Sequence, residues 1–143
     1  MNRIILILTL IFLIFSSCFV ENKLEEKEQV LELEYIAWAC ACANWVTTED
    51  RERYENDENS GDALSNLTFF IEEANKSLIL PDTLGYANDI IRFTGRFYKK
   101  KGFPKGVRTE PEEHLEKAKI FRYTKYEVVK SNFADIKKSL NEE

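Results

Sequence analysis

Apolar residues dominate the stretch from Leu31 to Val46, which holds both tryptophans and two of the three cysteines of the 143-residue chain. With a period of two, the stretch has one face rich in alanine and a second face on which Trp38, Cys40 and Cys42 lie together. A helix is the alternative, because alanine favours helices and apolar residues also recur at alternating steps of four and three. The strand is favoured, since no glycine or asparagine cap follows Trp45 and the next residues are β-prone. We therefore predict one long strand with buried tryptophans.

The rest of the pattern predicts a small, mostly β domain. Alternation is most regular over residues 90–98, where Ile91, Phe93 and Phe97 share one face around Gly95. A glycine in the middle of a strand predicts a bulge or a sharp bend. The other predicted elements are a loop or short helix at 47–62, a hairpin of strands 66–72 and 77–80, a short helix at 109–119, a strand at 120–129 and a terminal helix after Ser131.

The first residues differ from the rest of the chain. Residues 4–15 form a 12-residue apolar run interrupted only by Thr9. A membrane-spanning helix needs about 20 apolar residues, so the run is typical of a signal-peptide core. The run is followed by Ser16-Ser17-Cys18. This junction resembles the lipobox of bacterial lipoproteins, which implies cleavage before Cys18 and attachment of lipid to its thiol. A plain secretory signal and an uncleaved signal anchor are the alternatives.

We accordingly divide the chain into a lipoprotein signal peptide (residues 1–17), a flexible tether (residues 18–29) and a single β-rich domain (residues 30–143). The order of the predicted strands, together with the Gly95–Tyr98 segment, resembles the OB-fold. That resemblance implies a small five-stranded OB-like barrel with one or two short helices. The Trp38–Cys42 and Gly95–Tyr98 segments also resemble small Bacteroidota-type lipoproteins of uncharacterised family, which implies no known activity.

Charge is distributed unevenly along an acidic chain. The formal net charge is −5, so nucleic acid is not an expected partner for this protein at a membrane surface. Seven basic residues and no acidic residue nevertheless lie in one segment with interleaved aromatic side chains. Such a segment suits anionic headgroups or glycans, although a solvated basic face is the simpler interpretation. The seven are Arg92, Arg96, Lys99, Lys100, Lys101, Lys105 and Arg108.

The pair Cys40 and Cys42 is the candidate for special chemistry. On a strand the two thiols point to the same side, with Cα atoms about 6.6 Å apart, near the upper end of disulfide geometry. A structural or inert disulfide on a buried face is favoured, and a redox-active pair is the alternative. A metal site lacks ligands, because zinc prefers four and the only histidine, His114, is distant in sequence. We predict no metal and no cofactor.

The motifs of common hydrolases are absent. The sequence has one histidine, no Gly-x-Ser-x-Gly and no glycine-rich phosphate loop. The leading expectation is a cell-envelope protein, lipid-anchored to a membrane (the outer membrane favoured), that acts as a non-catalytic binding or assembly module. Its expected partners are the membrane, through the anchor, and an envelope protein, a glycan or an anionic lipid. The alternative is a thiol redox or copper(I)-handling protein that uses Cys40 and Cys42.

Overall fold

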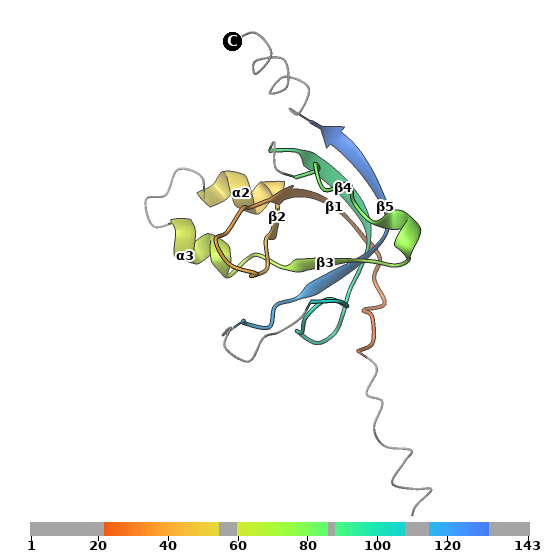
Figure 1. Cartoon of the computed structure of the whole chain (residues 1–143). Coiled ribbons are helices and arrows are strands. Elements are labelled where there is room, and N and C mark those ends of the chain that lie inside the picture. Colours follow the sequence, from red (N-terminus) through yellow and green to blue (C-terminus); the bar gives the residue numbers. More distant parts are fainter. Residues whose placement is uncertain (1–21, 55–59, 86–87, 108–114, 132–143) are drawn as a thin grey trace, which may run out of the picture.

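The computed structural model describes residues 22–54, 60–85, 88–107 and 115–131, which form a mostly β fold (Figure 1). Five strands make one mixed sheet, curled into a half-barrel, in the order β2-β1-β4-β5-β3. Neighbouring strands are antiparallel except β3 and β5, which are parallel. The strands are β1 (Gln29–Tyr35), β2 (Trp45–Thr47), β3 (Phe70–Glu73), β4 (Ile90–Phe97) and β5 (Ile120–Lys130). Two short helices, α2 (Thr48–Tyr54) and α3 (Ser60–Ser65), and the 3-10 turn η1 (Lys76–Leu78) complete the described elements.

The two edges of the sheet meet at one point. The Trp45 amide donates to the Phe69 carbonyl at 3.1 Å, and the Phe69 amide donates to the Trp45 carbonyl at 2.9 Å. Trp45 begins β2 and Phe69 directly precedes β3, so this bridge joins the first and last strands of the sheet order. The sheet therefore encloses a core instead of lying open on one side.

Alternating side chains fill the inside of the half-barrel. Leu33, Ile91, Phe93 and Phe121 are fully buried. Aromatic rings in this core pack edge to face. For example, the ring centroids of Phe93 and Tyr123 lie 4.9 Å apart. Such burial supplies most of the free energy that offsets the loss of chain entropy on folding.

The predicted bend at Gly95 is confirmed. The pairing of β4 with β5 shifts register between Thr94 and Gly95. A Cβ atom on Gly95 would collide with the carbonyl group of Arg122 and would lie 2.8 Å from Tyr123 Cα. Glycine is required here because the backbone of β5 occupies the space that a side chain would need.

The long strand predicted over residues 31–46 is wrong in its second half. β1 ends at Tyr35, and residues 36–44 form a loop that leads into the three-residue strand β2. The strand pattern arose from alternating alanine and cysteine residues, whose small side chains also suit a tight loop. Of the two tryptophans predicted to be buried, Trp45 is 6% exposed but Trp38 is only half-buried. On the apolar face of β4, Phe93 is fully buried and Phe97 is half-buried.

The predicted hairpin is also wrong. Residues 76–78 form η1, with Asn75 as its N-cap, and β3 pairs with β5 in parallel. The short helix expected over 109–119 is not formed over residues 115–119, where Ala118 instead bridges Gly102. Part of that prediction and all of the terminal helix after Ser131 lie outside the described residues.

Residues 22–25, which fall in the predicted tether, contact the barrel. Leu24 forms an isolated bridge with Tyr98. The Lys99 amide donates to the Lys23 carbonyl at 2.8 Å, and Asn22 exchanges hydrogen bonds with the backbone of Lys100. This part of the predicted tether is therefore held against the chain that leaves β4.

Candidate functional site

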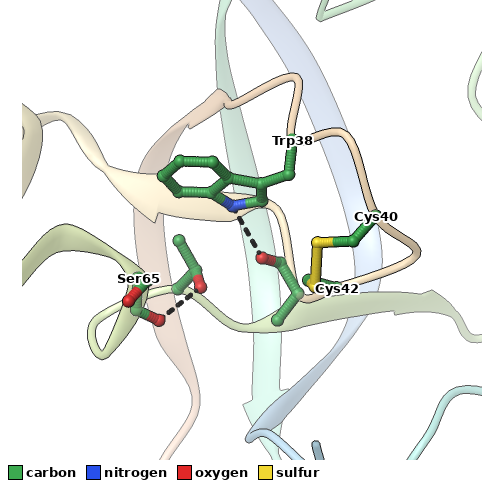
Figure 2. The surroundings of a disulfide bond; sticks show 6 residues. Trp38, Cys40, Cys42 and Ser65 are labelled. Carbon is green, nitrogen blue, oxygen red and sulfur yellow. Dashed lines mark hydrogen bonds between the residues drawn. A yellow bond between two sulfur atoms is a disulfide. The ribbon is translucent and has the colours of Figure 1, made fainter. Parts of the chain in front are cut away.

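The loop between β1 and β2 carries the two cysteines. The Ile36 amide donates to the Asn44 carbonyl at 2.8 Å, which closes the neck of the loop. Inside it, Cys40 and Cys42 form a disulfide with Cα atoms 5.2 Å apart (Figure 2). The pair thus lies on a loop, with Cys40 exposed and Cys42 half-buried, and not on the buried face of a strand.

A second contact fixes the same loop. The indole Nε1 of Trp38 donates to the Ala43 carbonyl at 3.1 Å, and the Trp38 amide donates to the Ile36 carbonyl at 3.0 Å. Figure 2 shows the indole and the disulfide on one loop. The hydrogen bond to Ala43 therefore holds the half-buried ring of Trp38 in one orientation. Residues 40–42, which the disulfide joins, lie between Trp38 and Ala43.

This loop forms one wall of a cavity of about 620 Å³. Residues 65–69, which lead into β3, and residues 116–119, which lead into β5, also line it. Leu31 and Phe97 line it from inside the half-barrel. The volume is in the usual range for small-molecule sites, about 300–1,000 Å³. The apolar residues of the lining are Leu31, Trp38, Ala43, Leu67, Phe69, Phe97 and Ala118.

Lysines supply the positive charge of the cavity lining. Lys101, Lys117 and Lys119 belong to it, and Lys119 Nζ lies 5.5 Å from the centre of the Phe97 ring. The acidic residues of the lining are Glu116 and Asp50. Asp50 already accepts a hydrogen bond from Thr47 at 2.8 Å and pairs with Arg53 at 3.3 Å. The site therefore combines an apolar wall with an excess of positive charge.

A buried glutamate anchors the chain that brings Lys101 to the cavity. Glu72, in β3, is only 5% exposed. Its carboxylate accepts a hydrogen bond from the Tyr98 hydroxyl at 2.7 Å and from the Lys105 amide at 3.0 Å. Burial, and then the hydrogen bond to Glu72, raise the pKa of Tyr98 to about 12, so its hydroxyl remains a donor. Segment 98–105 is thereby fixed at both ends.

Sequence reasoning missed Glu72, although one signal was present. Phe70 and Glu72 occupy alternate positions of β3, and both are buried. A carboxylate on the same face of a short strand as a phenylalanine is unusual unless it is hydrogen-bonded. The partners of Glu72 come from residues distant in sequence, so the pattern alone could not name them.

The seven predicted basic residues do not share one role. Arg92 pairs with Glu32 at 2.6 Å and with Glu127 at 3.4 Å. Arg96, Lys99, Lys100, Lys101 and Lys105 are exposed, and Lys101 alone among them lines the cavity. Arg108, the predicted lipidation site Cys18 and His114 lie outside the described residues.

Two other kinds of feature are absent from the described part of the chain. Those residues contain no group of three or more histidine, cysteine, aspartate or glutamate residues arranged to hold a metal ion. Among them, no helix has the length and apolar character needed to cross a bilayer.

No known protein family, curated protein or solved structure matches the chain. Its function must therefore be inferred from the cavity and from the residues that surround it.

Proposed function

We propose that this protein is a lipid-anchored envelope protein that acts as a binding module and takes its ligand in the cavity beside the disulfide loop. The cavity carries this proposal. It lies where two connections of the sheet converge, the loop 36–44 between β1 and β2 and the chain between β4 and β5. Backbone groups in both are held by hydrogen bonds, so the walls are organised before a ligand arrives.

The topology supports the OB-like part of the proposal. OB-folds are five-stranded, partly open Greek-key barrels that bind oligonucleotides or oligosaccharides through one face and through the loops between strands 1 and 2 and strands 4 and 5. Here five strands curl until their edges meet, and the corresponding loops line the cavity. Nucleic acid is not the ligand that we propose, because the chain is acidic overall.

The lining favours a ligand with an anionic group on an apolar or sugar body. Lys101, Lys117 and Lys119 suit the anionic group. The indole of Trp38 and the ring of Phe97 offer flat apolar surface. A glycan or lipid headgroup of the envelope has this chemistry.

The binding part is tested with anilinonaphthalene sulfonate, an anionic aromatic dye, and the full chain in a mild detergent below its micelle concentration. Ser65 is exposed and lines the cavity, so Ser65→Trp should obstruct the site and weaken dye binding by about fivefold or more, which is about 1 kcal/mol. Thr83→Trp is the matched control, because Thr83 is exposed and does not line the cavity. Equal dye affinity for both variants, measured by fluorescence titration, would contradict the proposal.

The anchor is tested separately. Because the apolar run ends at Ser16-Ser17-Cys18, Cys18→Ala should abolish incorporation of labelled fatty acid. It should also leave the precursor uncleaved, because a lipoprotein leader is removed only after its cysteine has been lipidated. Cys42→Ala is the control and should remain lipidated. A Cys18→Ala variant that incorporates labelled fatty acid and is cleaved as the parent is would exclude lipid anchoring through this residue.

A further inference from the structure

The disulfide is open to both solvent and the cavity. Cys40 is exposed, Cys42 is half-buried, and both belong to the lining of the 620 Å³ space. The inert pair predicted from the sequence depends on a regular strand, which would place both sulfurs on a buried face. The loop removes that reason, since access is one of the main determinants of disulfide reactivity.

Cross-linking does not account for the bond. A disulfide stabilises a fold mainly by closing a long loop of the unfolded chain, whereas Cys40 and Cys42 are two residues apart and lie in the same loop. The neck of this loop is already closed by the bond between Ile36 and Asn44, and its turn by the bond between Trp38 and Ala43. The disulfide can therefore open while the loop keeps its attachment to β1 and β2.

The charges around the cavity suit thiol chemistry. Thiolates, and not thiols, attack disulfides, and nearby cations stabilise thiolates, including the one that leaves. Lys101, Lys117 and Lys119 line the same cavity as the two cysteines. Of the two acidic residues there, Asp50 is engaged by Arg53 and Thr47.

We propose that Cys40–Cys42 is a thiol–disulfide exchange site and that its substrates are anionic thiols, such as small cysteine-containing peptides, that enter the cavity. The proposal depends on the proposed function only in requiring that the cavity admit a ligand. The chemical class follows from the site: a thiol group to meet the disulfide and a carboxylate to meet the lysines.

The exchange proceeds in two steps. A substrate thiolate attacks Sγ of the exposed Cys40, a mixed disulfide forms, and the Cys40–Cys42 bond breaks with the electron pair leaving on Cys42, which takes up a proton. A second substrate thiolate then attacks the substrate sulfur of the mixed disulfide, which releases Cys40 as a thiolate that is protonated in turn. Two thiols are oxidised to one disulfide, the protein disulfide is reduced to two thiols, and two electrons are transferred.

The test uses the oxidised full chain and reduced glutathione, a peptide thiol with a net negative charge. Samples are quenched with acid, alkylated and analysed by mass spectrometry. The reference is a peptide with the sequence of residues 36–44, closed by the same disulfide. We expect the protein to react about tenfold faster than the peptide, because the peptide has the disulfide without the cavity. A rate equal to or below that of the peptide would overturn the proposal.

Charge selectivity gives a second readout. At equal thiolate concentration the protein should react faster with glutathione than with cysteamine, a cationic thiol. The double variant Lys101→Gln, Lys117→Gln should lose most of this preference, whereas Lys76→Gln, at an exposed lysine outside the cavity, should keep it. A preference that is absent in the parent or unchanged in the double variant would show that the cavity does not select the thiol, and would overturn the proposal.

The order of attack is tested with variants that keep one cysteine of the pair, in a chain in which Cys18 is replaced by alanine so that no third thiol reacts. Cys42→Ser should take up one equivalent of glutathione from oxidised glutathione, and faster than Cys40→Ser does, because Cys40 is the exposed partner. Faster uptake by Cys40→Ser would overturn the proposed order.

Dye binding that depends on Ser65, combined with exchange rates equal to those of the peptide, would refute the exchange site and leave the proposed function standing. Fast, charge-selective exchange without such dye binding would refute the proposed function and leave the exchange site standing.

Discussion

Replacement of Trp45 by alanine is expected to lower the free energy of unfolding by about 3–5 kcal/mol, in the range for a large aromatic residue removed from a core. The indole is 6% exposed and makes edge-to-face contacts with Tyr35 and Phe93, with ring centroids 5.5 Å away in each case. The backbone of Trp45 also forms the bridge to Phe69 that joins the two edges of the sheet. Loss of the side chain therefore leaves a void at the point where the half-barrel closes.

The measurement is urea unfolding followed by circular dichroism, which does not depend on the tryptophans as fluorescence would. Trp38→Ala is the matched control, because it removes the same side chain from a half-buried position in the loop. It should cost about 2 kcal/mol, from the loss of one hydrogen bond and of part of the apolar burial. If Trp38→Ala proved as destabilising as Trp45→Ala, the assignment of the core to the inside of the half-barrel would be wrong.

Gly95→Ala is expected to destabilise the protein by about 3 kcal/mol or more, or to prevent folding. The added methyl group would collide with the Arg122 carbonyl on the neighbouring strand. Because both partners in the collision are backbone, relief requires that β4 and β5 separate or change their register. Relaxation of a flexible side chain cannot provide it.

Gly61→Ala is the control, since Gly61 lies in α3 and a Cβ atom added there would have nothing within 4 Å. Alanine is the better helix former by about 0.8–1.0 kcal/mol, so this variant should be neutral or more stable than the parent. Thermal unfolding monitored by circular dichroism compares the two variants under the same conditions. A Gly95→Ala protein with the melting temperature of the parent would show that β4 and β5 do not approach as closely as the structure has them.

The two longest strands were predictable from the sequence. β4 runs from Ile90 to Phe97 and β5 from Ile120 to Lys130, close to the predicted bounds of 90–98 and 120–129. At the centre of β4, fully buried apolar residues alternate with half-buried polar ones, so the period of the strand is visible without knowledge of its partners. The bulge at Gly95 was equally predictable, because a glycine interrupts that pattern within the strand.

Pairing between distant segments was not predictable. Residues 66–80 contain two β-prone runs close in sequence, and this proximity favours a local hairpin. The structure instead places β3 beside β5 in parallel, with Phe70 opposite Ile120. This arrangement lets Phe69 reach Trp45 and gives Glu72 its contacts with Tyr98 and Lys105.

The candidate site shows the same division. The sequence identified Cys40, Cys42 and Lys101, because cysteine pairs and basic runs are visible as residue types. It did not identify the cavity that they share, since its walls come from separated parts of the chain. It also misjudged the surroundings of the cysteines, because alternating alanine and cysteine can occupy a strand or a tight loop equally well.

By itself, the sequence determined the apolar N-terminal run with its cysteine junction, the acidic net charge, the two long strands near residues 90–98 and 120–129, and the irregularity at Gly95. Each of these depends on residue type and local periodicity, which the chain carries wherever it folds. The tertiary structure alone decided that residues 36–44 leave the sheet as a loop, that β3 joins β5 and that the disulfide faces a cavity. These outcomes depend on contacts between residues that are far apart in the sequence. Which of those contacts form is decided by the packing of the whole sheet.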